Sequence, residues 1–195
     1  PGVKAGGEAE VCVMGGGPAG STIARKLAAL GHRVSLIERA VFPRHHLGES
    51  LAPSILPLLD VLGLREAIEQ ADFLRPERVH IRWSAATDQR KSRAAGPGFQ
   101  VDRGSFDRLL LNAARDAGAN ILQPCLIPHR PTRAGARWNV PVQWNDRTGT
   151  VVADILVDAS GRSSFMQGTR TRYGVAALAL YGYWRDTALS GPGKS

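Results

Sequence analysis

A glycine-rich hexapeptide near the start of the chain has the residue types and the spacing of a phosphate-binding turn. Gly15, Gly17 and Gly20 fit G-x-G-x-x-G, in which glycines allow a tight turn, a close backbone approach to a diphosphate, and close helix–strand packing. The motif alone is a weak signal, because 22 of the 195 residues are glycine. Its context is stronger: the apolar run Val11–Met14 is typical of a buried strand, and Pro18-Ala19 open a helical pattern. Such a helix would direct free N–H groups and a partial positive charge at phosphates.

An acidic residue follows at the position expected for ribose recognition. Glu38 lies at the end of a second predicted strand, Arg33–Glu38, which has an alternating pattern. Its carboxylate would accept hydrogen bonds from the adenosine ribose hydroxyls, which favours FAD or NAD over the 2′-phosphate of NADP. The alternative is a glycine turn without a ligand and a surface glutamate at a strand end. Taken together, the two features favour a dinucleotide site.

Hydrophobic periodicity predicts the elements that must hold these residues. The helix Pro18–Leu30 places Ile23, Leu27 and Leu30 on one face and ends at Gly31. Together with the flanking strands it forms a βαβ unit. The other predicted helices are Ala52–Leu62, Glu66–Ala71 and Ser105–Ala117, and the other predicted strands are Arg78–Ser84, Asn120–Leu122, Arg137–Trp144, Val151–Val157 and Val175–Trp184. We expect Arg39–Ser50 to be a loop and Ala85–Gly98 to be a loop or a hairpin.

Composition argues against several other functions. The formal charge is +8, but the arginines are scattered singly and do not alternate with aromatic residues, so we expect no nucleic-acid partner. No segment reaches the about 18–20 apolar residues of a membrane span, and the first ten residues lack a signal-peptide core, so a cytoplasmic protein without membrane contact is expected. Cys12 and Cys125 are too few for a disulfide framework, and a single disulfide between them is left as an alternative. No cluster of residues has metal-ligand spacing.

Several segments resemble one family of flavoproteins. The string Gly15–Thr22, followed by Glu38-Arg39, resembles the opening of FAD-dependent oxidoreductases of the aromatic-hydroxylase class. The segment Phe42–Leu51 is similar to the "PR-x-H-x-GES" loop of flavin-dependent halogenases and related monooxygenases. The segments Val101–Leu110 and Leu156–Arg162 agree with the same family. The resemblance runs from Glu10 to about Asp186 and implies the N-terminal part of such an FAD-dependent protein.

The resemblance also implies a set of cofactor contacts. Arg44 would contact a phosphate, Gly48 would let the backbone pass close to FAD, and Arg103 would face the cofactor. The full expected set is Gly15, Gly17, Pro18, Ala19, Gly20, Glu38, Arg39, Arg44, Gly48, Glu49, Ser50, Arg103 and Asp158. As alternatives, Arg44 and Arg103 are ordinary surface arginines and Asp158 caps a turn. Adjacent histidines on a loop usually point in opposite directions, so neither His45 nor His46 is assigned a role, and the catalytic residues stay unknown.

The predicted fold class is α/β: a Rossmann-like FAD-binding domain with three-layer ββα architecture plus part of a β-rich substrate domain. Residues 8–70 would hold the FAD-binding βαβ unit and the GES loop, and residues 71–100 would begin a substrate-domain insertion. Residues 101–170 would return to the FAD-binding domain, and residues 171–195 would begin a truncated substrate-domain sheet.

Two departures from the family bear on the reaction. The halogenase segment W-x-W-x-I-P and the second FAD motif "GD" are absent, and no lysine occurs between Lys26 and Lys91, although the family's lysine would fall near Pro76. Arginine stays protonated and cannot form a haloamine. The sequence therefore favours an FAD-dependent monooxygenase that hydroxylates an aromatic substrate through a flavin C4a-hydroperoxide. An indole, a phenol or a tryptophan carried by a partner protein would be the substrate.

Three alternatives remain: an FADH2-dependent halogenase, a flavin reductase acting on polyprenyl groups, and a non-catalytic FAD-binding fragment. The sequence has no second G-x-G-x-x-G loop for NAD(P)H. That fits either a separate flavin reductase as a partner or transient nicotinamide binding.

Overall fold

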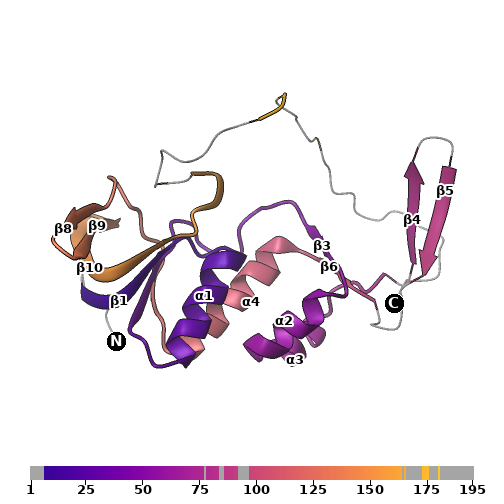
Figure 1. The fold of residues 1–195 in the computed structure, drawn as a ribbon, viewed down its shortest axis with the longest axis horizontal. Coiled ribbons are helices and arrows are strands. Elements are labelled where there is room, and N and C mark those ends of the chain that lie inside the picture. Colours follow the sequence, from indigo (N-terminus) through magenta and orange to yellow (C-terminus); the bar gives the residue numbers. More distant parts are fainter. Residues whose placement is uncertain are drawn as a thin grey trace.

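A six-stranded sheet with helices on one face forms the body of the computed structural model, which describes residues 7–76, 78–83, 86–91, 97–163, 165, 173–175 and 180 (Figure 1). The strands are β1 (Gly7–Met14), β2 (Val34–Ile37), β3 (Glu49–Leu51), β4 (Arg78–Trp83), β5 (Ala86–Lys91), β6 (Phe99–Val101), β7 (Asn120–Leu122), β8 (Thr132–Ala134), β9 (Arg137–Trp144) and β10 (Arg147–Asp158). The helices are α1 (Pro18–Ala29), α2 (Ile55–Leu62), α3 (Arg65–Glu69) and α4 (Arg103–Asp116), with a short 3-10 turn at Gly161–Ser163.

The main sheet has the strand order β7-β2-β1-β10-β9-β8. The first four strands are parallel, while β9 and β8 run antiparallel to their neighbours. The long strand β10 joins the two parts: Val151–Asp158 pairs with β1, whereas Arg147–Ala153 pairs with β9. A parallel nucleotide-binding sheet therefore continues into an antiparallel meander.

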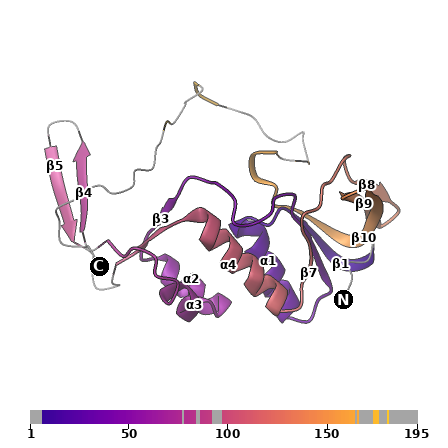
Figure 2. The same cartoon turned by 180° about the vertical axis from the view of Figure 1, so that it is seen from behind.

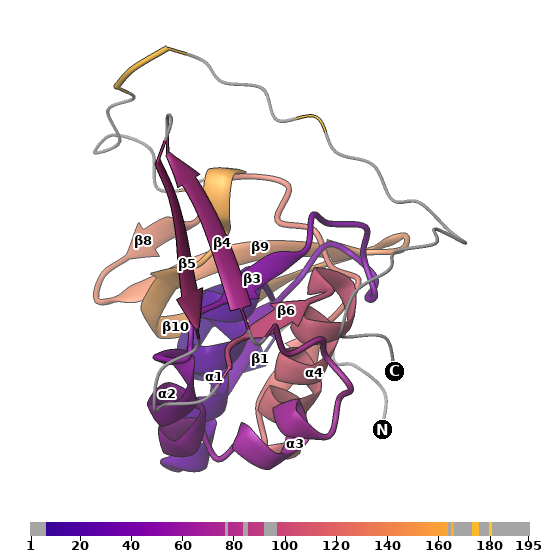
Figure 3. The same cartoon turned by 90° about the vertical axis from the view of Figure 1, so that its right-hand side faces the viewer.

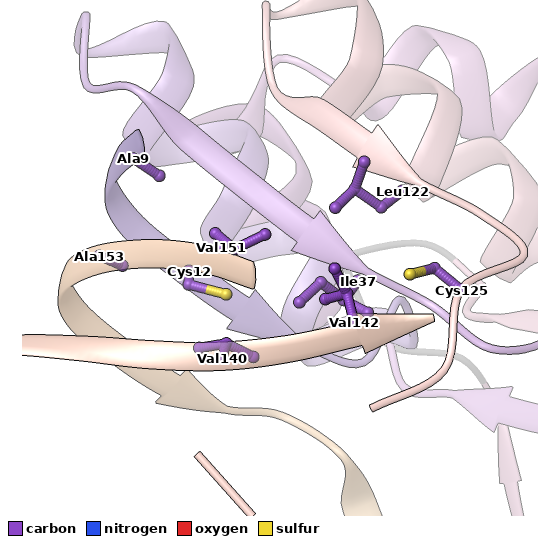
Figure 4. Packing of buried hydrophobic residues seen from close by; sticks show 9 residues of the cluster. All are labelled: Ala9, Cys12, Ile37, Leu122, Cys125, Val140, Val142, Val151 and Ala153. Carbon is purple, nitrogen blue, oxygen red and sulfur yellow. The ribbon is translucent and has the colours of Figure 1, made fainter. Parts of the chain in front are cut away.

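Apolar side chains fill both faces of the parallel strands. On one face, Val13 and Leu36 pack against Leu111 and Ala114 of α4, and α1 and α4 lie side by side there (Figures 1 and 2). On the other face, the cluster drawn in Figure 4 joins the parallel strands to the meander through Cys12, Ile37, Leu122, Val140 and Val142, among others. The helices, the parallel sheet and the meander thus form three successive layers, which confirms the predicted three-layer ββα architecture.

A third apolar cluster lies around α2 and α3. It contains Leu56, Leu59, Ile68, Phe99 and Phe106. Strands β3 and β6 form a two-stranded antiparallel ribbon beside it (Figure 3). Strands β4 and β5 form an antiparallel hairpin beyond it, at the opposite end of the molecule from β8 (Figures 1 and 2). The predicted division into FAD-binding and substrate segments stays a prediction.

Most predicted elements are present, and the differences have local causes. Strand β2 is buried on both faces rather than alternating, because it lies inside a sheet covered on both sides. Leu30 is 64% exposed and does not join the buried face of α1. Helix α4 begins two residues earlier than predicted, since the Asp102 side chain accepts a hydrogen bond from Ser105 N and caps it at 2.8 Å.

The segment 85–98, left open between a loop and a hairpin, contributes β5 to the β4–β5 hairpin. Most of the predicted strand Val175–Trp184 lies outside the described residues. Within the part of the chain that the structure describes, no helix combines the length and the apolar character needed to cross a bilayer.

Candidate functional site

The glycine turn is held in place by backbone contacts. Gly15 has φ +102°, a conformation that favours glycine, and its N–H donates to the Ile37 carbonyl at 2.8 Å. A β-carbon on Gly20 would lie 1.8 Å from the Gly15 carbonyl oxygen. Helix α1 then begins after Gly17 without a side-chain cap, so N–H groups of its first turn are directed outward without a capping oxygen. The turn has the local geometry that the motif predicts.

Glu38 lies directly beside this turn. Its side chain is 3% exposed, and its two carboxylate oxygens accept hydrogen bonds from Gly16 N and Ala40 N, each at 2.7 Å. The Glu38 backbone is fixed as well, because its N–H donates to the Leu122 carbonyl and its carbonyl accepts from Cys125 N. An ionised carboxylate has about four acceptor positions, so two contacts leave capacity for hydroxyl donors.

A cavity of about 630 Å³ opens where β1, β2 and β10 end. In open α/β sheets, ligands bind outside the carboxyl ends of the strands, which is where this cavity lies. Its walls contain the glycine turn and Glu38, and the complete lining is Met14, Gly15, Gly17, Pro18, Ala19, Ile37, Glu38, Arg39, Arg44, His46, Arg103, Cys125, Leu126, Ile127, Ala159, Ser160, Gly161, Arg162 and Phe165. Glu38 is the one acidic residue among these, against four arginines, so the lining suits an anionic ligand.

Two of the cavity arginines share one buried carboxylate. Asp107 of α4 is fully buried, and its Oδ2 accepts from Arg44 Nη2 at 2.9 Å. Arg103 donates to the same carboxylate through Nε at 2.8 Å and Nη2 at 3.2 Å, and through Nη1 to Glu49 at 2.8 Å. The hydrogen bond to Asp107 raises the pKa of Arg103 above its ordinary value, so the guanidinium stays charged.

Arg44 connects this group to the glycine turn. Its Nη1 lies 3.8 Å from Glu38 Oε1, and its guanidinium stacks over the Phe42 ring at 4.8 Å. A β-carbon on Gly17 would lie 3.3 Å from Arg44 Nη2. Arg44 Nε is buried and has no hydrogen-bond partner among the residues that the structure describes. An orphaned buried donor over a glycine turn is what a phosphate ligand would satisfy.

The remaining predicted residues fall into two groups. Pro18, Ala19 and Arg39 line the cavity, whereas the cavity lining does not include Gly48, Glu49, Ser50 or Asp158. Ser50 Oγ donates to Gln100 across the β3–β6 ribbon at 2.7 Å, and Glu49 reaches the site through Arg103.

Asp158 stabilises the turn at the end of β10. Its Oδ1 accepts from both the N–H and the hydroxyl of Ser160, which agrees with the alternative that Asp158 caps the end of its strand. The residues that follow it, Ala159 to Arg162, contribute to the cavity instead. His46 lines the cavity and His45 does not, as expected for neighbouring histidines that point apart.

Sequence reasoning assigned no role to Asp107 or to the apolar wall formed by Cys125, Leu126 and Ile127. A usable signal existed for Asp107, which stands four residues after Arg103 on an otherwise apolar helix face. Cys12 and Cys125 are both free and buried. Burial raises the pKa of Cys12 to about 12 and raises that of Cys125, so these thiols stay protonated and are not nucleophiles at neutral pH.

Comparison with known proteins relates the chain to flavin-dependent halogenases. A family model described as tryptophan halogenase matches residues 10–85. A tryptophan 2-halogenase of Chondromyces crocatus is 37% identical over 194 residues, which cover 92% of this chain and 36% of the relative. A flavin-dependent halogenase of Armillaria mellea is 33% identical over 209 residues, which cover 96% of this chain and 38% of the relative. The chain thus spans little more than a third of the length of these relatives.

Solved structures show the same relationship. The myxobacterial chondrochloren halogenase CndH superposes with a TM-score of 0.74 at 30% identity, over 80% of this chain and 38% of that one. The anhydrotetracycline hydroxylase OxyS from Streptomyces rimosus, at 18% identity and a TM-score of 0.66 over 82% of this chain and 33% of that one, shares the fold alone.

The ββα sheet and the glycine-turn cavity define a domain of the FAD-dependent oxidoreductase class. Within that class, the family model and the sequence relatives show that the chain is similar to flavin-dependent halogenases, as the resemblance in its GES loop predicted.

Proposed function

We propose that this chain is the FAD-binding portion of a flavin-dependent halogenase that acts on an electron-rich aromatic substrate. The observation that carries the proposal is the combination of a basic cavity at a glycine turn with sequence relatives that are named as halogenases. This differs from the expectation of hydroxylation. The relatives named above that share 30% sequence identity or more with the chain are halogenases, whereas the hydroxylase with the same fold shares 18% identity.

The residues of the cavity suit the adenosine diphosphate half of FAD. The N–H groups of the glycine turn and of the α1 N-terminus would hold the diphosphate, together with Arg44. Glu38 would accept hydrogen bonds from the ribose hydroxyls. Apolar side chains of Cys125, Leu126 and Ile127 offer a surface for the adenine ring. When bound, the flavin supplies the oxidative chemistry, and the protein supplies binding, orientation and exclusion of water.

Hydroxylation is the second candidate, and one observation favours it. The chain has no lysine between Lys26 and Lys91, and Pro76 occupies the region where the resemblance places the halogenase lysine. A protein with this cavity but without that lysine would suit direct oxygen transfer to the ring. In either case we propose an indole, a phenol or a tryptophan on a partner protein as substrate, with a separate reductase as the source of reduced flavin.

Single-turnover product analysis distinguishes the two reactions. The intact protein would be mixed with chemically reduced FAD, O2 and bromide, and with a panel of indoles, phenols and tryptophan peptides, and the products weighed by mass spectrometry. A brominated product that disappears when bromide is omitted supports the halogenase. A product heavier by one oxygen, formed equally with and without bromide, overturns it in favour of the hydroxylase.

Matched controls test whether the cofactor site is responsible. Oxidised FAD in place of reduced FAD should give no product, because the reaction needs reducing equivalents. If stoichiometric FAD binds and neither product forms with any substrate, the chain serves as a binding module and both catalytic proposals fall.

A further inference from the structure

Asp107 is the most deeply buried acidic side chain among the described residues, and neither the glycine turn nor the family motif explains it. It lies in the first turns of α4 with an exposed fraction of 0%, facing the 39–48 loop rather than solvent. Taking a carboxylate out of water is costly unless charged partners compensate it. Its compensation comes entirely from Arg44 and Arg103 among the contacts described.

The three groups form an arrangement with an excess of positive charge. One carboxylate is shared by two guanidinium groups, and Arg103 has a second acidic partner in the 53%-exposed Glu49. Arg44, by contrast, has only the more distant Glu38 carboxylate, at 3.8 Å. Glu49 and Glu38 offset the charge that Asp107 alone leaves uncompensated, so Arg44 faces the cavity as a hydrogen-bond donor rather than as a net positive charge.

The position of Arg44 depends on Asp107. The 2.9 Å bond to Asp107 is the short ion pair of Arg44, while its other contacts are the 3.8 Å approach to Glu38 and the stacking on Phe42. Because the loop around Arg44 contains no helix or strand until β3, the side chain needs a fixed anchor to reach the glycine turn. Asp107, on the rigid helix α4, provides that anchor.

We propose that Asp107 is the positioning residue of the cofactor site: its buried carboxylate holds Arg44 over the glycine turn, where the Arg44 guanidinium binds the diphosphate. The inference rests on the proposed function, since it presumes a dinucleotide ligand in the cavity. Arg44 lines the cavity, its Nη2 lies next to Gly17, and its buried Nε has no hydrogen-bond partner among the described residues. Asp107 itself touches no phosphate and acts through Arg44.

Comparing a ligand with and without phosphates tests this role. Affinities of the intact protein for ADP and for adenosine would be measured by calorimetry in Asp107→Asn and in the wild type. Loss of the anchor should weaken the affinity for ADP by about tenfold or more, which is the scale of one charge-assisted hydrogen bond. The affinity for adenosine should change by less than about twofold. Asp116→Asn is the matched control, because Asp116 is an exposed aspartate on the same helix, and it should leave both affinities unchanged.

A merely structural role predicts a different outcome. If Asp107→Asn weakens ADP and adenosine by the same factor, or leaves both unchanged, the proposal is overturned. Should that variant not fold, Asp107→Glu keeps the charge but displaces the carboxylate by about one bond length, and the ADP-to-adenosine affinity ratio should fall several-fold; an unchanged ratio would also overturn the proposal. If the wild-type protein binds neither FAD nor ADP, the proposed function itself fails.

Discussion

The two walls of the cavity are built in different ways. The backbone wall consists of the glycine turn, Gly15–Gly20, where carbonyl and N–H groups lie too close to neighbouring atoms for any side chain at Gly20. The arginine wall consists of Arg44 and Arg103, which ion pairs with Asp107 and Glu49 behind the cavity lining hold in place. These side chains come from two segments more than fifty residues apart. Local sequence thus determines the first wall, and tertiary structure determines the second.

This difference implies different responses to substitution. A backbone wall has no flexible part, so an added methyl group must displace main chain or leave the turn unformed. A side-chain wall loses one interaction at a time, so its variants should show graded losses of affinity. Four substitutions, from the largest expected effect to the smallest, test this contrast.

Gly20→Ala should have the largest effect. Its β-carbon would lie 1.8 Å from the Gly15 carbonyl oxygen and 3.2 Å from the Ala159 β-carbon, and neither atom belongs to a flexible side chain. We expect FAD binding to be lost and the free energy of unfolding to fall by about 3 kcal/mol, the upper end for overpacking. Urea denaturation and quenching of flavin fluorescence measure the two quantities. Gly7→Ala is the control, because its β-carbon would meet nothing within 4 Å. Wild-type FAD affinity in Gly20→Ala would show that the backbone wall is not rigid.

Gly17→Val separates binding from stability. Gly17 has φ −69° and ψ −177°, a conformation that valine adopts readily, and the nearest atom to a β-carbon is the mobile Arg44 Nη2 at 3.3 Å. The protein should therefore stay folded, with a change in unfolding free energy within about 1 kcal/mol. FAD binding should nevertheless be lost, because the side chain fills the path of the diphosphate. Equilibrium dialysis against FAD checks this, and full retention of flavin would remove Gly17 from the site.

Glu38→Ala should have a smaller, graded effect. Loss of the ribose hydrogen bonds should weaken FAD binding by about 1–3 kcal/mol, the scale for a hydrogen bond to a charged group. The variant also leaves Gly16 N and Ala40 N without their acceptor, so its thermal stability should be recorded in parallel. Glu8→Ala, which removes a 64%-exposed glutamate of the same sheet, should change neither quantity. Unchanged FAD affinity in Glu38→Ala would exclude Glu38 from the site.

Local sequence patterns predicted the backbone wall but not the arginine wall. The strand, glycine turn, helix and Glu38 follow one another within about thirty residues, so a linear pattern could reveal them. Arg44 and Arg103 were expected near the cofactor, but only because of the resemblance. Their common partner Asp107 has a local signal only toward Arg103, four residues before it, whereas its contact with Arg44 spans 63 residues, which no local pattern contains.

The same limit explains the missed strands. Strand β9 was predicted with its full bounds, Arg137–Trp144, because eight residues are enough to show a strand pattern. Strands β3, β6 and β8 have three residues each, too few for a period, and exist because a partner strand lies alongside. Strand β7 is equally short, but it was predicted because it follows directly on the helix that Gly118 ends. The sequence favoured hydroxylation for a related reason, whereas the relatives that are named as halogenases favour halogenation. One absent lysine outweighed the general similarity to halogenases, although its alignment near Pro76 depended on ungapped spacing.

Asp102→Ala should have the smallest effect and touches neither wall directly. The Asp102 carboxylate caps α4, the helix that carries Arg103 and Asp107, through its bond with Ser105 N. Loss of the cap should lower the free energy of unfolding by about 1 kcal/mol at pH 7. The backbone hydrogen bond from Ser105 lowers the pKa of Asp102 below its ordinary value. Because the folded pKa is the lower one, the cap stabilises fully above the unfolded pKa of about 4 and is lost as the pH falls through the folded pKa. The difference between wild type and variant in urea denaturation should therefore shrink when the pH is lowered from 7 toward 3. A difference that stays constant over this range would mean that the carboxylate charge does not cap the helix, and that Arg103 and Asp107 are held by packing of α4 alone.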